Sequence, residues 1–450
     1  MSSELFPSNV IIIGAGVFGL STALAIAKRH PTTKVTVIDR LVPPVADGES
    51  VDTTRCIRAD YDDPVYARLA KEAQRKLEDD PDLSRHMFRQ GMTWVSDGQP
   101  DENTESWKVQ FELAKASSNP DDIVIFNSRE EVYQTIHGEN ALPPSNVKPR
   151  WTMGYCNLEN AFIDAKECIQ VYYDRCLRIP SMTVRCGTPV RQITSVNGKA
   201  TGVILEDGNS VTADLVIVAA GAWSNKLVDL GNRASSIAIA VAWIKVTPEE
   251  EARWKGMSIT TNLNTGLNLF PPYRGEMKVL CRLGGYKNTV LVQHPEDPSR
   301  TMQISHPRTL ITHPSDLIPA DAEATIRENL REIMPMLADR PFDRTRLCWR
   351  SRAPTEDFLI APHPRIAGIH LATAGSGHGW KFLPVIGDFI VDSVQGTLPR
   401  ELQEMWAFHR YHERVRPDRN FASIVLETNS IHLSAPPERW RYTARLDHQG

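Results

Sequence analysis

The sequence predicts an α/β fold, α+β overall, in which a βαβ-based domain is joined to a second, mainly antiparallel β-sheet domain. Three observations predict it. An apolar strand over 11–13 runs into a glycine turn and then a helix. A second apolar strand, over 214–218, ends in small residues, and a third, from 369, runs into another glycine turn. Between these segments, short strand-like runs separated by turns indicate a β-rich domain.

The N-terminal unit has the pattern of a dinucleotide-binding fingerprint. Gly14 permits a tight turn, Gly16 lets backbone amides approach a pyrophosphate, and Gly19 lets the helix pack close to the strand. The helix over 21–27 offers unpaired N–H groups and a positive dipole end to that pyrophosphate. Asp39 ends the next strand, 20 residues past Gly19, where a carboxylate can hold a ribose hydroxyl. Together they predict a Rossmann-like domain that binds a dinucleotide; the alternative is a glycine-rich turn in another kind of α/β protein.

Composition bounds the class of protein. A chain of 450 residues exceeds one ordinary hydrophobic core, so two domains are expected. Hydrophobic residues at 41% and charged residues at 24% are typical of globular proteins, and a net charge of −4 provides no general attraction to nucleic acid or acidic membranes. The apolar stretch 11–27 follows no basic residue and is interrupted by glycines, which argues against a signal or membrane segment.

The cysteines are seven and scattered, and no CxxC pair occurs. Neither a zinc site nor a disulfide framework is therefore indicated, and a reducing compartment fits best. Residues 446–450 lack an SKL-type peroxisomal address. We expect a cytoplasmic, monomeric protein without a metal site, with no nucleic acid and no membrane among its partners.

The remaining elements are predicted from apolar periodicity. Helices are expected at 66–83, 161–177 and 322–334 (the last with Asp321 as N-cap), and strands at 34–39, 92–95, 123–126, 190–196, 200–205, 238–246, 266–270, 277–283 and 289–294. The expected division of the chain is a discontinuous cofactor-binding domain (1–85, 150–230 and 340–400), a substrate domain (86–149 and 231–339) and a tail of unknown role (401–450).

Three separated segments together resemble the FAD-dependent amine oxidases of the D-amino-acid-oxidase superfamily. They are the N-terminal fingerprint, VIVAAGAW over 216–223 and GSGHGWKFLP over 375–384, supported by CWR at 348–350 and PTEDFLI at 354–360. The sequence is most similar to the sarcosine oxidase, pipecolate oxidase and fungal fructosyl amino acid oxidase (amadoriase) group. The resemblance implies a GR2, D-amino-acid-oxidase type of FAD-binding domain. It also implies hydride removal from a carbon beside a secondary amine, with O2 reduced to H2O2 and hydrolysis of the imine.

The resemblance implies catalytic roles for four residues. Lys381 matches the lysine that pairs with the substrate carboxylate, and Arg58 the arginine that completes this clamp, which can be bidentate. Lys278 matches a lysine above the flavin ring, where a cation stabilises superoxide or flavin anion. His378 either hydrogen-bonds substrate or flavin or is structural. Solvated surface charges are the alternative for the lysines and the arginine. No general base stands out, and hydride transfer from a neutral amine does not require one.

The resemblance also implies a cofactor-binding set. Cys348 stands where this group attaches flavin through a thioether; the flanking arginines favour the thiolate, and a buried structural cysteine is the alternative. Arg55 contacts flavin or pyrophosphate, or forms a surface ion pair. The full predicted set is Gly14, Gly16, Val17, Phe18, Gly19, Asp39, Arg40, Thr54, Arg55, Val190, Ala220, Gly221, Trp223, Cys348, Gly377, Gly379, Trp380 and Lys381.

One residue departs from the amadoriase pattern. In fructosyl amino acid oxidases, an acid that grips the sugar follows the lysine matched by Lys278. Arg282 stands there in this chain, and the reversed charge argues against a sugar–amine substrate and suits a substituent that bears a carboxylate. Segment 52–58 is also closer to the sarcosine and pipecolate oxidase pattern.

We therefore predict an FAD-dependent oxidase of an N-substituted or cyclic amino acid, such as sarcosine, pipecolate, saccharopine or a natural-product intermediate. A fructosyl amino acid or peptide oxidase is the first alternative, and a flavin-binding protein without oxidase turnover is a more remote one. A nicotinamide-dependent dehydrogenase would share the first fingerprint but would not explain Cys348 or GSGHGWK. A flavin monooxygenase would require NAD(P)H.

Overall fold

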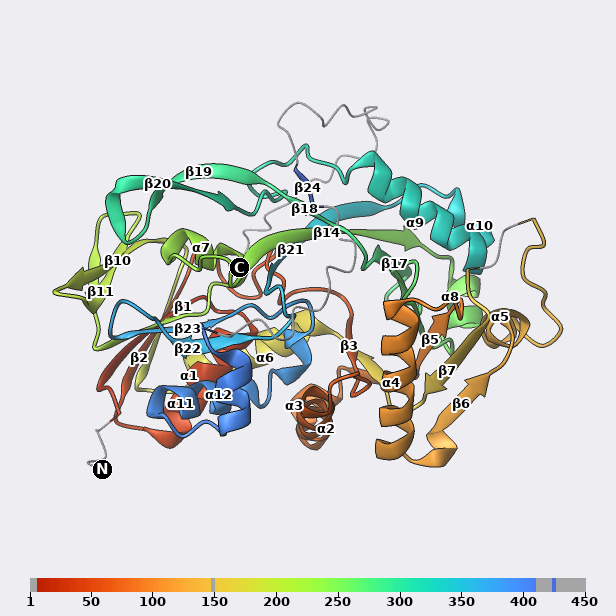
Figure 1. Cartoon of the computed structure of the whole chain (residues 1–450), viewed down its shortest axis with the longest axis horizontal. Helices are drawn as coiled ribbons and strands as arrows, with labels where there is room; N and C mark the ends of the chain where they lie inside the picture. Colours follow the sequence, from red (N-terminus) through yellow and green to blue (C-terminus); the bar gives the residue numbers. More distant parts are fainter. Residues whose placement is uncertain (1–5, 147–149, 410–422, 426–450) are drawn as a thin grey trace.

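The structure, a computed structural model, describes residues 6–146, 150–409 and 423–425. Most of the predicted tail (410–422 and 426–450), including the C-terminal residues that bear on a peroxisomal address, lies outside the described residues. Two large sheets dominate the fold and lie side by side in Figure 1. No helix in the described part of the chain is both long and apolar enough to cross a membrane.

The first sheet has six strands and contains the N-terminal βαβ unit. Five strands are parallel and the edge strand β22 runs antiparallel to β23. In spatial order the strands are β22 (Leu359–Pro362), β23 (Ile369–Thr373), β13 (Leu215–Val218), β1 (Asn9–Ile13), β2 (Lys34–Asp39) and β9 (Met182–Cys186). The predicted parallel arrangement of the strands at 11–13, 34–39, 214–218 and 369 is confirmed, and β9 is an addition that the sequence did not indicate.

The second sheet is larger and mainly antiparallel, as predicted, although β15 pairs with β5, and β18 with β24, in parallel. In spatial order it contains β24 (Ser423–Val425), β18 (Gly285–Lys287), β14 (Ser235–Lys245), β17 (Glu276–Cys281), β16 (Leu267–Leu269), β15 (Ile259–Asn262), β5 (Met92–Ser96), β7 (Met153–Asn157) and β6 (Ile123–Phe126), with β21 (Arg344–Arg352) also paired to β14. Thus β7 and β21 join the second sheet, although the sequence placed their segments in the cofactor-binding part.

Three small sheets complete the β structure. One joins β3 (Arg55–Ile57), β8 (Ala161–Ile163) and β4 (Met87–Arg89); the second joins β10 (Val190–Val196), β11 (Lys199–Leu205) and β12 (Ser210–Thr212); the third is the hairpin of β19 (Thr289–His294) and β20 (Asp297–Ser305).

The helices cover the sheets, and Figure 1 shows α1, α11 and α12 on one side of the first sheet. The α-helices are α1 (Val17–Arg29), α2 (Pro64–Asp79), α3 (Pro81–Ser84), α4 (Glu102–Ser117), α5 (Arg129–His137), α6 (Ala165–Leu177), α7 (Ser224–Leu227), α8 (Pro248–Trp254), α9 (Ala320–Ile333), α10 (Pro335–Ala338), α11 (Ile386–Gln395) and α12 (Arg400–Trp406). Short 3-10 turns are η1 (Pro120–Asp122), η2 (Gly221–Trp223) and η3 (Gly379–Phe382).

Capping residues explain where three predicted helices differ from the observed ones. The segment 161–177 was predicted as one helix, but 161–163 form β8, and α6 begins after Asp164, whose side chain accepts from the N–H of Glu167. The predicted helix 66–83 is divided between α2 and α3 at Asp80, which precedes a proline. Asp321 was predicted as an N-cap, but Pro319 holds that position.

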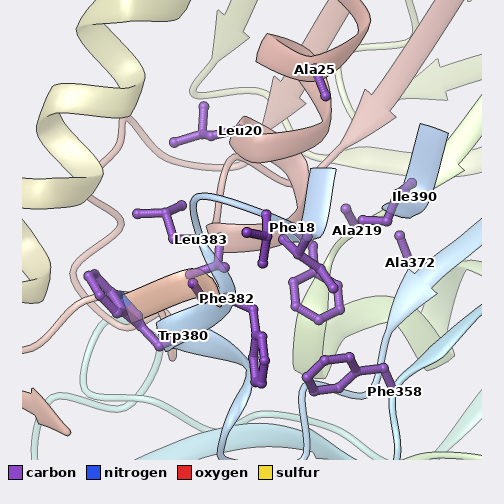
Figure 2. Close-up of a cluster of buried hydrophobic side chains, with 14 of the residues drawn as sticks. Phe18, Leu20, Ala25, Ala219, Phe358, Ala372, Trp380, Phe382, Leu383 and Ile390 are labelled. Atoms are coloured by element: carbon purple, nitrogen blue, oxygen red, sulfur yellow. The ribbon is translucent and has the colours of Figure 1, made fainter. Parts of the chain in front are cut away.

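A buried apolar cluster ties the first sheet to the segment that follows the second glycine turn. Figure 2 shows side chains of α1, the strand ends, η3 and α11 packed together. Burial of this surface is the main favourable term that holds the loop 375–383 against the glycine turn of β1. The labelled members are Phe18, Leu20, Ala25, Ala219, Phe358, Ala372, Trp380, Phe382, Leu383 and Ile390.

Candidate functional site

A cavity of about 1870 Å³, counting its opening to solvent, lies at the carboxyl ends of β1, β2 and β13. This is the edge at which parallel α/β sheets bind ligands. Its lining includes most of the predicted cofactor-binding residues: Gly14, Gly16, Val17, Phe18, Asp39, Arg40, Arg55, Val190, Ala220, Gly221, Trp223, Gly377, Gly379 and Trp380.

The glycines of the first turn allow close approach of neighbouring atoms around this cavity, because they have no side chains. Gly14 has a φ of +108°, and a Cβ there would lie 2.4 Å from the carbonyl oxygen of Ala219. A Cβ on Gly16 would lie 2.6 Å from Oγ of Ser50. Gly19 does not line the cavity; a Cβ there would lie 1.8 Å from the carbonyl oxygen of Gly14, so its role is to let α1 pack on the turn.

Polar groups line the same end of the cavity. Asp39 accepts from the N–H of Ala15 at 2.7 Å and from the N–H of Leu41 at 3.1 Å, and burial raises its pKa. The guanidinium of Arg40 stacks 4.1 Å over the ring of Trp223. A glycine-lined cradle with a carboxylate at the end of β2 fits a dinucleotide.

Ser50 is a lining residue that the sequence did not single out. Its Oγ accepts from the N–H of Val17, the first residue of α1, at 3.0 Å. Its carbonyl oxygen accepts from Nε1 of Trp380 at 2.9 Å. Ser50 therefore joins the two glycine turns, which are more than 300 residues apart in the chain.

Three other predicted cofactor residues do not line this cavity: Thr54, Cys348 and Lys381. Cys348 is buried on β21, with its Sγ 3.8 Å from Nη2 of Arg55. Arg55 does line the cavity, so the thiol lies one side chain away from the wall.

Lys278 lies in a buried ionic cluster. Its Nζ donates to Oδ2 of Asp52 at 3.1 Å and to the carbonyl oxygen of Thr54. Asp52 also pairs with Arg55 and, at 3.6 Å, with Arg346. Burial lowers the pKa of Lys278 to about 8, against the opposing effect of Asp52. Burial alone would raise the pKa of Asp52, but its three cationic neighbours hold it well below its usual value.

A second cavity, of about 920 Å³, adjoins the first. Gly377 lines both, so the two cavities meet at the second glycine turn. Its lining includes Arg58, Tyr61, Trp94, Arg282, Arg350 and His378. The wall also contains the carboxylates Asp62, Glu356 and Asp357, and the predicted residues Arg58 and His378 both line it.

Lys381 stands directly behind this wall. It is buried, and its Nζ donates to Oη of Tyr61 at 2.8 Å and to the carbonyl oxygen of His378 at 3.0 Å. Burial, and then the charge of Arg58, hold its pKa well below the usual value. Within the described residues, no carboxylate forms an ion pair with it. Lys381 is thus a buried cation surrounded by neutral and cationic groups.

His378 and Tyr61 form a defined hydrogen-bond chain. Nε2 of His378 lies 2.8 Å from the carbonyl oxygen of Glu356, so that nitrogen carries the proton. Nδ1 then accepts from Oη of Tyr61 at 3.0 Å. Burial and the adjacent Lys381 lower the pKa of His378 to about 3, which keeps the ring neutral. The Tyr61 hydroxyl therefore accepts from Lys381 and donates to His378.

Arg58 is held above two aromatic rings. Its guanidinium lies 4.4 Å from the ring centre of Tyr61 and 5.0 Å from that of Trp94, and it donates to the carbonyl oxygen of Asp60. The Asp60 carboxylate in turn accepts from Nε1 of Trp94 at 2.9 Å. These contacts fix the guanidinium before any ligand arrives, which reduces the entropy lost on binding.

The comparisons with known proteins agree with this architecture. The family described as DAO, FAD dependent oxidoreductase, matches residues 9–393. The chain belongs to this family. L-saccharopine oxidase of Schizosaccharomyces pombe is 28% identical over 410 residues, covering 88% of this chain and 92% of that protein. Amino acid oxidase imqH of Aspergillus flavus is 26% identical over 467 residues, covering 89% and 98%. The crystal structure of the fructosamine oxidase Amadoriase II from Aspergillus fumigatus has a TM-score of 0.76 at 27% identity and covers 89% of each chain.

The family confirms the predicted fold class and FAD as the cofactor. The larger cavity fits that cofactor, because its glycine turn, acidic strand end and apolar walls are all present in one place. Sequence reasoning missed Asp52, Tyr61 and Trp94. Asp52 stands in segment 52–58, but the pattern of that segment gave it no role, and only proximity in space reveals the partners of all three residues.

Proposed function

We propose that this protein is an FAD-dependent oxidase that oxidises the C–N bond of a secondary amine bearing a carboxylate. The observation that carries the proposal is the junction at Gly377, where the dinucleotide cavity meets a cavity lined by arginines and backed by a buried lysine. An anionic amino acid bound in the second cavity would lie next to the ligand of the first.

The chain's own residues bind and orient the substrate. Lys381 and Arg58 would hold the carboxylate, and the aromatic rings of Tyr61 and Trp94 keep the guanidinium in place. His378, neutral and already bonded on both nitrogens, positions Tyr61 rather than transferring a proton. Bound FAD would supply the redox chemistry, taking a hydride from the carbon beside the nitrogen and reducing O2 to H2O2, while water converts the imine to an amine and a carbonyl compound.

Lys278 would supply the positive charge that favours oxygen reduction. It is fixed by Asp52 and lies beside Arg55, which lines the FAD cavity. A cation pre-positioned in a dry site stabilises developing negative charge without reorganisation of solvent. Covalent attachment of the flavin through Cys348 is part of the proposal, supported by the Arg55 guanidinium beside its sulfur.

We also propose a reducing compartment such as the cytoplasm, and a monomer. All seven cysteines are free thiols, which supports the compartment. The alternative activity, fructosyl amino acid oxidation, is favoured by the likeness to Amadoriase II. Arg282 lines the substrate cavity and counts against it, because a guanidinium cannot accept hydrogen bonds from sugar hydroxyls.

The proposal is tested by an absorbance spectrum before and after acid precipitation, followed by anaerobic addition of sarcosine, pipecolate, saccharopine and fructosyl-valine. We expect flavin colour in the pellet, bleaching by secondary amino acids, and H2O2 on readmission of air. In Cys348→Ala the colour should move to the supernatant, whereas Cys186→Ala should keep it in the pellet. A colourless protein, or bleaching by fructosyl-valine as fast as by the simple secondary amino acids, would overturn the proposal.

A further inference from the structure

The substrate cavity contains more positive charge than one carboxylate requires. Lys381 and Arg58 suffice for an amino acid's own carboxylate. Two further arginines, Arg282 and Arg350, also line this cavity. They come from different strands of the second sheet: Arg350 lies on β21 and Arg282 directly follows β17. Their convergence on one cavity therefore depends on the tertiary structure and not on a shared motif.

Arg350 is a cation of the cavity wall that lacks a direct polar partner within the described residues. Within the described residues, its side chain forms no ion pair and no hydrogen bond, and its Nε is buried without a partner. Burial lowers its pKa, and the nearby Arg352 lowers it further. Arg350 is half-buried and lines the cavity, so an anion bound there would gain a charge-assisted hydrogen bond that no described residue already makes.

The position of Arg350 places it at the boundary between the two cavities. Its Nη1 lies 2.5 Å from the point that a Cβ on Gly377 would occupy, and Gly377 lines both cavities. Arg350 itself lines the substrate cavity and not the dinucleotide cavity. The anion that it faces is therefore one carried by the substrate.

Arg282 extends the positive surface at the other end of the cavity. Its guanidinium carbon lies 5.9 Å from the ring centre of Trp94, the ring that also carries Arg58. Its backbone N–H donates to the carbonyl oxygen of Gly266 at 2.6 Å, which fixes the turn after β17. Its charge reaches Lys381, whose pKa it lowers. Arg282 therefore belongs to the same electrostatic site as the carboxylate clamp.

Three carboxylates line the cavity: Asp62, Glu356 and Asp357. Glu356 forms an ion pair with Arg352 at 3.1 Å, and Asp62 accepts from Oγ of Ser106 at 2.7 Å. Glu49 and Glu356 raise the pKa of Arg350 by their charge, but within the described residues no carboxylate forms an ion pair with it.

We infer that the substrate is an N-(carboxyalkyl) amino acid, a secondary amine with a carboxylate on each of its two carbon branches. This inference rests on the proposed function and names its substrate class. Lys381 and Arg58, with Arg282 near them, hold one carboxylate, and Arg350 holds the carboxylate of the other branch. Two anionic groups pinned on opposite sides of the nitrogen orient the C–N bond more firmly than one can. A monocarboxylate would leave Arg350 uncompensated and bind more weakly.

The test is a binding measurement that requires no turnover. Thiodiacetate and (ethylthio)acetate have a sulfur in place of the amine nitrogen and differ only in that a methyl group replaces the second carboxylate. Each is titrated into the FAD-loaded enzyme, and its Kd is read from the change in the flavin absorbance spectrum. We expect thiodiacetate to bind roughly 10- to 100-fold more tightly. Equal affinities, or no binding of thiodiacetate, would overturn the inference.

Variants assign the difference to the arginines. In Arg350→Gln the advantage of thiodiacetate should shrink about tenfold or more while the affinity for (ethylthio)acetate changes little. The exposed Arg191→Gln, which also removes one positive charge, should leave both affinities within about twofold. An equal loss for both ligands in Arg350→Gln would contradict the assignment. If Arg350→Gln fails to retain flavin, Arg350→Lys, which keeps a positive charge, should retain the preference for thiodiacetate, and loss of that preference in a flavin-loaded Arg350→Lys would contradict the assignment.

Oxidation assays separate this inference from the proposed function. Iminodiacetate and N-ethylglycine form the corresponding amine pair. If neither these nor any other secondary amine reduces the flavin, the proposed oxidase activity fails. If N-ethylglycine is oxidised with a KM equal to or below that of iminodiacetate, the activity holds and the two-carboxylate inference fails.

Discussion

The molecule contains two buried lysines near its cavities, and their surroundings are opposite. Lys278 has a carboxylate partner, Asp52, which it shares with two arginines. Within the described residues, Lys381 is bonded only to a hydroxyl and a carbonyl, and the cations Arg58 and Arg282 are close enough to lower its pKa. The first lysine is already compensated by the protein, whereas the second is not.

This difference indicates what each region is for. A compensated cluster keeps its geometry whether or not a ligand is bound, which suits a fixed charge beside the flavin site. An uncompensated cation is stabilised when an anion binds to it. The free-energy cost of burying the lysine without a partner is then offset by the ion pair, which increases the affinity for the anion. Substitutions at four residues test this contrast, from the largest expected effect to the smallest.

Asp52→Asn removes the shared counterion and should have the largest effect. It removes the carboxylate that pairs with buried Lys278 and with the half-buried Arg55 and Arg346, which should reduce the free energy of unfolding by about 3–5 kcal/mol. Denaturant unfolding of the FAD-loaded protein measures it, with exposed Asp207→Asn as the matched control.

The same variant should alter the dependence of stability on pH. The folded pKa of Asp52 lies below its unfolded value of 3.8, so its contribution is complete above that pH and is lost as pH falls toward the folded pKa. In Asp52→Asn the acid limb of the stability curve should be shallower. An unchanged acid limb would show that Asp52 is not the ionised partner of Lys278.

Lys278→Met should slow the oxidation of reduced flavin by O2 by about 10²- to 10³-fold, because it removes a fixed cation from the site of charge development. Anaerobic reduction by substrate should change far less, since the substrate cations remain. Stopped-flow absorbance separates the two half-reactions, and Lys245→Met, on the exposed end of β14, is the control. Equal slowing of both half-reactions would place Lys278 in the substrate site instead.

Lys381→Met should raise KM for a carboxylate substrate about 10- to 100-fold, with exposed Lys199→Met unchanged. Only the protonated amine pairs with a carboxylate, and burial lowers its pKa below 10.5. Affinity in the unmodified enzyme should therefore decrease with rising pH well before 10.5, and this decrease should be absent in Lys381→Arg. If the affinity of Lys381→Arg decreases with the same midpoint pH, the titrating group is not Lys381.

His378→Gln should have the smallest effect. With a pKa of about 3 the ring is neutral throughout the pH range of an ordinary assay, so it contributes no inflection to the pH profile of KM between pH 5 and 8. Loss of its bonds to Tyr61 and Glu356 should weaken substrate binding about 3- to 10-fold. Disappearance of an inflection near pH 6 in this variant would show that His378 titrates, contrary to this account.

Particular residues show how far the sequence could be read. The glycine turn at Gly14 and the strand end at Asp39 were predictable because their roles are local and depend on backbone geometry. The partner of Lys278 was not, because Asp52 lies 226 residues away in the chain. The same is true of Tyr61, which is separated from Lys381 by 320 residues. Predicted helix boundaries failed where a cap such as Asp164 competed with apolar periodicity.

The sequence by itself determined the family and the dinucleotide fingerprint, because these depend on short segments with fixed spacing. Only the tertiary structure decided which of those charges are compensated. Four cations of the site are spread over more than 300 residues of the chain, and the sequence shows only that each is positively charged: Arg58, Arg282, Arg350 and Lys381. Burial and the presence or absence of a nearby carboxylate make one lysine a permanent part of the framework and leave the other dependent on a ligand.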